Sequence, residues 1–400
     1  MQRFAKSFTE QPALPQASLD AAARVLASAR LHRYQADAAG CFEVANLEQE
    51  FAAWQSAKYC LAVTSGGQAL QIAMRAIGVQ HNEPVLTNAF TLAPVPGAIR
   101  AVGGAPILVE TTQDLVIDLD DLKAKAEASG ARVLVLSHMR GHLVDMDALM
   151  RVAKGCALTV IEDCAHTMGA TWHGIKSGNF GKIACFSTQT YKHINSGEGG
   201  FITSDDPDAM ARATIMSGSY MNFDRHAASP TEQHFTTAKY DCPNMSARMD
   251  TLRAAILRPQ LGTLDQDVAT WKKLGATFEA ALAGAAHLRI PSRPDAACRV
   301  PSSVQFRLPA FSAEQCERFC EAALHRGIEV KWFGKSTPER YTSSFHHWHY
   351  IPRQSMPNTD AVLATLFDLR LPLTFDVDDC RALAAIIVET ASAALSEVAA

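Results

Sequence analysis

The chain lacks the features that mark several large classes of protein. None of its apolar stretches is long enough to span a bilayer, and its first ten residues lack the apolar core of a signal peptide. Its 37 basic and 41 acidic residues leave a net charge of −4, and the basic residues are dispersed instead of forming the stripe that nucleic-acid binding requires. We therefore expect a cytoplasmic protein with no membrane and no nucleic-acid partner.

Motifs of other enzyme classes are also missing. The sequence has no glycine-rich dinucleotide fingerprint and no HExxH motif. Ten cysteines in a chain of this length, mostly inside apolar segments, suit reduced core thiols better than disulfides. Cys316 and Cys320 lie four residues apart on a predicted helix, but no second pair of ligands follows at a spacing typical of zinc. The sequence therefore predicts no metal site.

Short apolar segments alternate with helical stretches or loops along the first two thirds of the chain, which is typical of an α/β fold with a mainly parallel sheet. Strands are predicted at residues 59–64, 84–88, 106–110, 132–137, 158–163, 183–187 and 200–203. Near residue 265 the pattern changes to a smaller α/β unit. We expect a large domain over 1–265 and a small C-terminal domain over 266–400, with a helix from about Leu19 to Leu31 packing onto the small domain.

The most informative residues follow two of these strands. Asp163 ends one strand, and Ser187 and Lys192 follow another. The carboxyl ends of parallel strands share one edge of a sheet, so these side chains are expected to meet there. A lysine that forms a Schiff base and a carboxylate that keeps a ring nitrogen protonated are what pyridoxal phosphate (PLP) requires. Each residue alone fits a simpler interpretation, a solvated lysine or a helix-capping aspartate.

A glycine turn upstream strengthens the PLP interpretation. Gly66, Gly67 and Gln68 lie between a predicted strand and a predicted helix. A helix N-terminus offers unpaired N–H groups, and glycine lets the backbone approach an anion closely. Such turns also occur in proteins that hold no phosphate. Together with Asp163 and Lys192, the turn predicts a cradle for the phosphate of PLP.

From about residue 40 to 270, the sequence resembles the DegT/StrS family of PLP-dependent aminotransferases. The segments that carry the resemblance, in the family's order, are residues 63–70, Phe90-Thr91-Leu92-Ala93, 138–147, 162–170, 186–192 and Gly197-Glu198-Gly199-Gly200. The resemblance implies a three-layer, fold type I architecture like that of aspartate aminotransferase. It adds that one strand of the seven is antiparallel and that the protein is a homodimer with shared active sites.

The resemblance also implies roles for individual residues. Lys192 would be the Schiff-base lysine, Asp163 the partner of the pyridine nitrogen, Ser187 a phosphate ligand and His166 a neighbour of the ring. The full expected cofactor-binding set is Gly66, Gly67, Gln68, Leu92, Asp163, His166, Ser187, Lys192 and Ser246.

Two members of this set depart from the family's pattern. Leu92 stands where an aromatic ring usually stacks on the cofactor, and Ser246 stands where an asparagine commonly reaches the phosphate of the neighbouring subunit. An aliphatic side chain covers a ring by dispersion but gives up the specific aromatic term of about 0.5–1.5 kcal/mol.

The function we expect is transamination. Glutamate or glutamine would convert PLP to pyridoxamine phosphate, which would then aminate a keto-sugar or a nucleotide-linked keto-sugar. Three alternatives stay open: a non-sugar keto or aldehyde acceptor, a PLP-dependent sugar dehydratase, in which histidine typically replaces the lysine, and a non-catalytic regulator. Two polar-aromatic loops, at residues 220–226 and 345–350, supply four of the five predicted substrate contacts, and an arginine in the segment 244–249 supplies the fifth. The histidine cluster of the second loop is also typical of an ordinary exposed loop or of a metal-binding tract. These contacts are Tyr220, Arg225, Arg248, His346 and His347.

Overall fold

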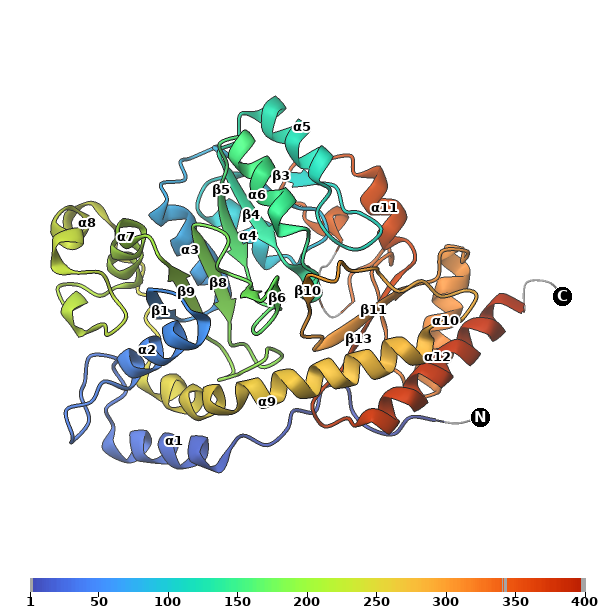
Figure 1. Ribbon diagram of the computed structural model, residues 1–400, viewed down its shortest axis with the longest axis horizontal. Coiled ribbons are helices and arrows are strands. Elements are labelled where there is room, and N and C mark those ends of the chain that lie inside the picture. Colours follow the sequence, from blue (N-terminus) through green and yellow to red (C-terminus); the bar gives the residue numbers. More distant parts are fainter. Residues whose placement is uncertain (1–2, 340, 342–343, 397–400) are drawn as a thin grey trace.

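A seven-stranded sheet forms the centre of the computed structural model, which describes residues 3–339, 341 and 344–396 (Figure 1). Its strand order is β1-β9-β8-β5-β4-β2-β3, and β9 runs antiparallel to both of its neighbours. The strands are β1 (Tyr59–Val63), β2 (Pro84–Asn88), β3 (Ala105–Val109), β4 (Val133–Ser137), β5 (Thr159–Asp163), β8 (Ile183–Ser187) and β9 (Gly200–Ser204). All seven predicted strands and the single antiparallel direction are confirmed.

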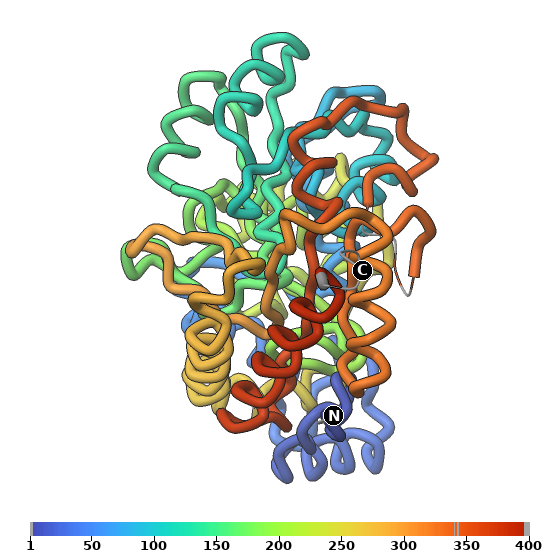
Figure 2. Tube along the Cα trace, turned by 90° about the vertical axis from the view of Figure 1, so that its right-hand side faces the viewer, coloured from blue at the N-terminus to red at the C-terminus, as the bar shows by residue number. Residues whose placement is uncertain are grey.

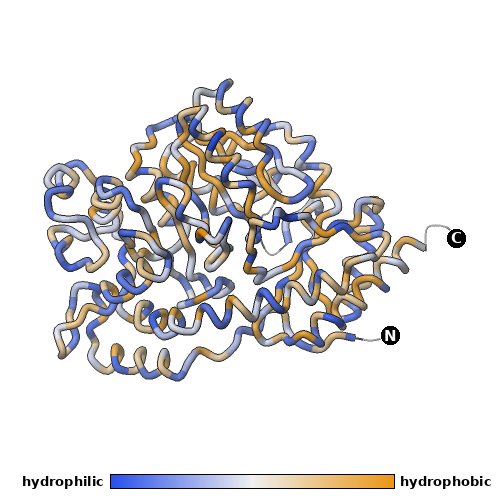
Figure 3. Tube along the Cα trace, viewed as in Figure 1, coloured by the Kyte–Doolittle hydropathy of each residue, from blue (hydrophilic) through white to orange (hydrophobic). Residues whose placement is uncertain are grey.

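Helices cover both faces of this sheet, so that helices, sheet and helices form three layers. Successive side chains of a strand point to opposite faces, so Val85 packs in one hydrophobic core and Leu86 in the other. One face is covered by α3 (Gly66–Ala76), α4 (Pro94–Ala101), α7 (Pro207–Ser217) and α8 (Phe235–Asp241). The other is covered by α2 (Glu43–Gln55), α5 (Leu119–Ser129), α6 (Met146–Gly155) and the first half of α9 (Thr251–Leu282). Figure 3 shows the hydrophobic strands enclosed by these mixed-polarity helices.

A third core, in the C-terminal part of the chain, surrounds a three-stranded sheet of order β11-β13-β12. Its elements are β11 (Ser303–Arg307), α10 (Ala313–His325), β12 (Lys331–Trp332), β13 (Leu366–Arg370) and α12 (Val377–Ser396). Helix α9 connects the large sheet to this core, because Leu257 packs in the core that also contains Leu86 and Phe278 packs in the C-terminal core. The boundary expected at residue 265 falls inside this helix, so the division into domains stays a prediction.

The N-terminal region contacts α9 and the C-terminal core. Helix α1 (Gln16–Ser28) packs along α9, and the hydroxyl of Ser18 donates a hydrogen bond of 2.9 Å to the carbonyl oxygen of Ile256. Phe4 and Phe8, which precede the helix, insert into the C-terminal core beside Phe375. Contact with the smaller unit is therefore made by the segment before α1, while α1 lies along α9 (Figure 1) and forms the lower edge of the molecule in Figure 2.

The remaining elements are short. They are β6 (Thr171–Trp172), β7 (Ile175–Lys176), β10 (Ala297–Cys298) and α11 (Pro357–Leu363). None of the ten cysteines is paired with another in the structure, and burial raises the pKa of Cys316 and of Cys320 to about 12. Within the described ranges, every helix is too short or too polar to cross a membrane.

Candidate active site

A cavity of about 940 Å³ opens at the carboxyl ends of the parallel strands. Ser137 of β4, Asp163 of β5 and Ser187 of β8 all line it, and the first two are paired in register. Lys192, from the loop after β8, lies in the same wall. The convergence expected from the sequence is present in the geometry of one chain, because neighbouring parallel strands end at one edge.

Asp163 lies almost buried at the base of this cavity, with 7% of its surface exposed. One of its carboxylate oxygens accepts a hydrogen bond of 3.1 Å from the hydroxyl of Ser137, and the other accepts one of 3.2 Å from the amide of Ala165. An ionised carboxylate has room for about four donors, so Asp163 keeps acceptor capacity facing the cavity. Burial raises the pKa of Asp163, and the charge of Lys192 opposes that rise.

Lys192 is held beside a neutral imidazole. Its Nζ lies 3.1 Å from Nε2 of His166. Burial, followed by the charge of Lys192, holds the pKa of His166 well below its usual range, so this ring is uncharged at neutral pH. Burial and the charge of Arg140 lower the pKa of Lys192 to about 7, against the opposing influence of Asp163. A substantial fraction of Lys192 is therefore a neutral amine at neutral pH.

The N-terminus of α3 forms the opposite side. Ser65 caps the helix, and its hydroxyl accepts a hydrogen bond of 3.1 Å from the amide of Gln68. Gly66 and Gly67 follow, and they line the cavity with the first amides of the helix, which lack intrahelical partners. A Cβ on Gly66 would come within 2.8 Å of the Cβ of Ser187, so only glycine allows this close approach. The helix end and the Ser187 hydroxyl make a cradle suited to an anion.

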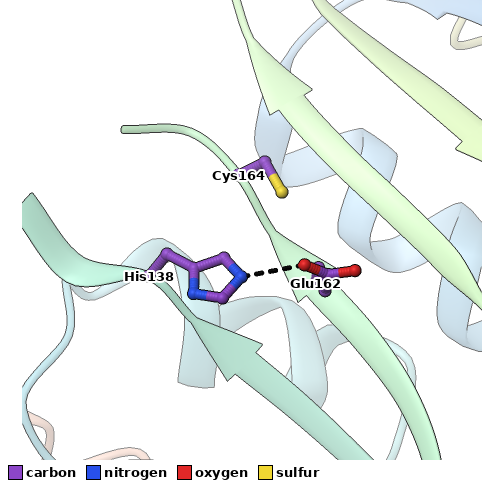
Figure 4. Close-up of side chains that lie close together, drawn as sticks. All are labelled: His138, Glu162 and Cys164. Carbon is purple, nitrogen blue, oxygen red and sulfur yellow. Dashed lines mark hydrogen bonds and ion pairs between the residues drawn. The ribbon is translucent and has the colours of Figure 1, made fainter. Parts of the chain in front are cut away.

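The adjacent carboxylate, Glu162, points into the opposite face of the sheet. It forms a buried group with His138 and Cys164, drawn in Figure 4, whose ligand atoms lie within 4.8 Å of one another. Glu162 already accepts four hydrogen bonds from the protein. They come from His138 Nε2 at 3.0 Å and from the amides of Gly178, Phe180 and Gly181 at 2.6–2.8 Å. We therefore interpret this group of three side chains as a structural support for the 178–181 loop.

The other predicted cofactor contacts fall into two sets. Leu92 lines the cavity, whereas Phe90 packs edge-to-face on Phe333 at 5.2 Å in a neighbouring core. Gln68 contributes its amide to the Ser65 cap, and its side chain is not part of the cavity wall. Ser246 is exposed outside the cavity of its own chain, and its amide donates to Asn244 at 2.8 Å.

The predicted substrate contacts also lie outside the wall of this cavity. Arg248 donates to the carbonyl oxygen of Gly218 at 2.9 Å and lies over the exposed ring of Tyr220. Arg225 donates to the carbonyl oxygen of Tyr34 at 3.2 Å. Elsewhere, His346 pairs with Asp360 at 2.6 Å, and His347 bonds the carbonyl oxygen of Ser336 at 2.9 Å. Within one chain these five residues do not gather around Lys192, and their role in substrate binding stays a prediction.

The outer wall holds residues that the sequence reasoning missed. They are Phe8, Thr9, Gln11, Arg140, Trp271, Glu329, Tyr341 and Arg370. Arg140 gave a signal, because it follows the strand at 133–137 and so belongs to the same sheet edge as Asp163. Arg370 gave none, because its strand was not recognised.

Solved structures share the fold of this chain. This fold is shared by 3-amino-5-hydroxybenzoic acid synthase, with a TM-score of 0.81 at 24% identity over 96% of this chain and 99% of that one. It is shared by S. venezuelae DesV in complex with a ketimine intermediate, with a TM-score of 0.78 at 25% identity over 94% of each chain. Spr1654 of Streptococcus pneumoniae in its PMP-form gives 0.84 at 16% identity over 99% and 100%. These neighbours confirm the predicted architecture.

The chain belongs to the DegT/DnrJ/EryC1/StrS aminotransferase family, whose model matches residues 25–387, a wider span than the resemblance found by motif. It is 29% identical to 3-amino-5-hydroxybenzoate synthase of Amycolatopsis mediterranei, over 90% of this chain and 91% of that protein. It is 30% identical to GDP-perosamine synthase of Caulobacter vibrioides, over 60% of this chain and 62% of that protein. The protein is therefore an aminotransferase, as predicted.

Proposed function

We propose that this aminotransferase uses PLP to move an amino group from glutamate or glutamine to a keto acceptor of the keto-sugar class. The observation that carries the proposal is the meeting of Lys192, Asp163 and the α3 N-terminus around one cavity. Relatives named for amino sugars support the acceptor class, and they include GDP-perosamine synthase and a dTDP-3-amino-3,4,6-trideoxy-alpha-D-glucose transaminase.

The residues present fit PLP. Asp163 has unfilled acceptor capacity and a neighbouring hydroxyl on Ser137 to orient it, as a partner of a protonated ring nitrogen needs. Gly66, Gly67 and Ser187 offer the helix end and hydroxyl that a phosphate needs. The amine of Lys192, with a pKa near 7, is available as a nucleophile at neutral pH.

When bound, PLP supplies an electron sink that acidifies the C–H bond beside the substrate's amino group. The chain's own groups supply the rest. Lys192 accepts a proton from the substrate carbon and returns it, since its pKa is close to the working pH. Asp163 stays ionised once it faces a cation, because an opposite charge lowers a carboxyl pKa. His166 stays neutral and keeps the Lys192 amine aimed into the cavity.

A non-sugar acceptor is a second candidate, and one comparison favours it. The similarity to 3-amino-5-hydroxybenzoate synthase extends over 90% of this chain, further than the 60% for GDP-perosamine synthase. The dehydratase alternative is less favoured, because Lys192 stands at the site while His193 turns away and stacks edge-on against Trp271 at 4.9 Å.

A homodimer with shared sites is also part of the proposal. Ser246 lies outside its own cavity, where it is free to complete the phosphate site of a second copy. Large exposed apolar residues in the 220–240 region, among them Met221 and Tyr240 at 61% and 80% exposure, are consistent with a covered surface. The cytoplasmic location stays a prediction.

A half-reaction assay tests the function. Glutamate added to the PLP-loaded protein should convert the visible band of lysine-bound PLP to that of pyridoxamine phosphate, with release of 2-oxoglutarate. The pyridoxamine phosphate form of the protein should then aminate keto-sugars without dehydrating them. A spectrum that changes with no amino donor would favour the non-catalytic regulator. Dehydration of the keto-sugar without gain of an amine would favour the sugar dehydratase.

A further inference from the structure

A second cavity, of about 530 Å³, lies at the opposite edge of the large sheet from Lys192. Its wall includes residues 78–81 and 100–103, which lead into β2 and β3, so it lies at the amino ends of these parallel strands. Helix α3 packs between α4 and α7 (Figure 1). The N-terminus of α3 lines the active-site cavity, and Arg75 in its last turn lines the second cavity, about 16 Å away for a helix of 11 residues.

Three arginines line this second cavity, which we call the basic cavity. They are Arg75, Arg100 and Arg212, and His81 lies in the same wall. Asp241, at the end of α8, is the single acidic residue in the described part of the wall. Among the residues that the structure describes, it forms no ion pair with any of the three arginines. The wall therefore carries a net positive charge.

The structure does not use these charges to cap helices, apart from one bond. An arginine near a helix C-terminus often bonds the last carbonyl groups of that helix. At α3 this role belongs to Arg132, which donates to the carbonyl oxygen of Gly78 at 2.7 Å, while Arg75 has no hydrogen bond or ion pair with any described residue. Arg100 donates once, to the carbonyl oxygen of Gly104 at 3.2 Å. A guanidinium has five N–H donors, so Arg100 keeps the others.

Arg212 gives an independent sign that an acceptor belongs in this region. It lies at the middle of α7, away from both ends of the helix, so it has no capping role. Its Nε is buried and has no hydrogen-bond partner in the described part of the chain. A buried N–H group without an acceptor destabilises the fold, and a ligand oxygen that reaches it would remove this cost.

We propose that the basic cavity binds an anion with two adjacent phosphate groups, such as pyrophosphate or the diphosphate of a nucleotide. Guanidinium groups match phosphate oxygens in pairs, and a cavity of about 530 Å³ is large enough for a whole metabolite. The cavity is formed in advance, because its two loops are joined by a hydrogen bond of 2.7 Å from the amide of Asn82 to the carbonyl oxygen of Gly103. This inference goes beyond the proposed function, since the two cavities share no described lining residue.

Calorimetric titration of the PLP-loaded protein with pyrophosphate tests the site. Prior saturation with PLP keeps pyrophosphate out of the phosphate cradle at the other end of α3. Arg75→Gln and Arg212→Gln should each weaken pyrophosphate binding by about 10–100-fold, because each removes charge-assisted hydrogen bonds to the anion. Arg151→Gln, at an exposed arginine of α6 on the other face of the sheet, is the matched control and should bind pyrophosphate like the wild type.

A charge-conserving variant and two other anions define the chemistry of the site. Arg212→Lys keeps the charge and loses the planar fork, so its affinity for pyrophosphate should lie between those of the wild type and Arg212→Gln. Inorganic phosphate and citrate should both bind the wild type more weakly than pyrophosphate. A nucleoside diphosphate that binds more tightly than pyrophosphate would assign the ligand to the nucleotides, and equal affinity would assign it to free polyphosphates.

Three results would overturn the proposal. The first is pyrophosphate binding that is the same in the wild type, Arg75→Gln and Arg212→Gln, with thermal melts showing all three folded. The second is an absence of pyrophosphate binding to the wild type at millimolar concentration. The third is citrate that binds as tightly as pyrophosphate and is lost in the same variants, because the wall would then be a general anion surface.

Discussion

Glu162 and Asp163 are adjacent carboxylates at the end of one strand, and the sheet assigns them opposite tasks. Glu162 faces the 178–181 loop and His138, where four donors of the protein satisfy it. Asp163 faces the cavity, where the protein supplies two donors. Burial opposes ionisation of both. The donors around Glu162 outweigh burial and lower its pKa, whereas the pKa of Asp163 is raised.

The difference shows how a scaffold group is told from a ligand group. A buried carboxylate whose lone pairs are all filled by its own chain stabilises a loop, and one that is left partly unfilled beside a cavity is ready for a ligand. Because side chains alternate along a strand, a shift of one position exchanges these tasks. Variants at and around the two residues can break or sharpen this comparison.

Removing the amine of Lys192, which lines the same cavity as Asp163, should have the largest effect. Lys192→Ala should lower turnover by at least about 10³-fold, since a positioned acid–base group contributes about 10²–10⁴ and the variant also loses the nucleophile. Lys182→Ala is the control, because Lys182 forms a half-exposed ion pair with Asp206 away from the cavity. Steady-state transamination measures both, and a Lys192→Ala enzyme with wild-type turnover would contradict the assigned role.

Asp163→Asn should weaken PLP binding by about 10²–10⁴-fold, because losing one partner of a buried charge pair costs about 3–5 kcal/mol. Burial raises the Asp163 pKa, so ionisation destabilises the cofactor-free fold at neutral pH. The cofactor-free variant should therefore melt at the same temperature as the wild type or higher. Fluorescence titration with PLP and thermal melts give the two values. A large drop in the melting temperature without PLP would place Asp163 with the scaffold.

Glu162→Gln should show the reverse pattern. In one orientation the amide NH2 group faces the N–H groups of Phe180 and Gly181, and in the other it faces the N–H group of Gly178, so the stability loss should be about 3–5 kcal/mol in denaturant melts. The folded pKa of Glu162 is lowered, so its stabilisation is present above the unfolded value, near 4.5, and is lost as pH falls through the folded pKa. The variant should therefore lose less stability on acidification than the wild type. Equal acid profiles would be evidence against this role.

The smallest expected effect is a shift in the pH dependence of PLP capture. Capture of PLP needs a neutral amine, so its rate in the cofactor-free protein should rise through pH of about 7, the pKa of Lys192. Arg140→Gln removes a nearby positive charge and should move this midpoint upward by about one unit. Arg381→Gln, at an exposed arginine of α12, is the control and should leave the midpoint in place. Stopped-flow mixing across pH measures the midpoint, and a wild-type value near that of a free lysine would show that the amine is not buried as described.

The sequence predicted that Asp163, Ser187 and Lys192 lie together at one edge of the sheet, as they do along the cavity, and it missed the residues of the outer wall. Asp163, Ser187 and Lys192 follow strands with clear apolar patterns, so local signals sufficed to place them at one edge. Arg370 ends a strand that pairs with segments about 40 and 60 residues away, and Tyr341 reaches Arg140 from 201 residues along the chain. No local sequence pattern marks contacts between residues so far apart in the chain. The distinction between Glu162 and Asp163 likewise depends on which face of the sheet meets the cavity.

The most direct measurement of the central claim is the position of the covalent bond to PLP. The loaded protein would be reduced with borohydride, digested, and analysed by mass spectrometry. We predict a phosphopyridoxyl group on Lys192, and its loss in Lys192→Ala with Lys182→Ala unchanged. A label on any other lysine, or an unlabelled protein after full loading, would contradict the account.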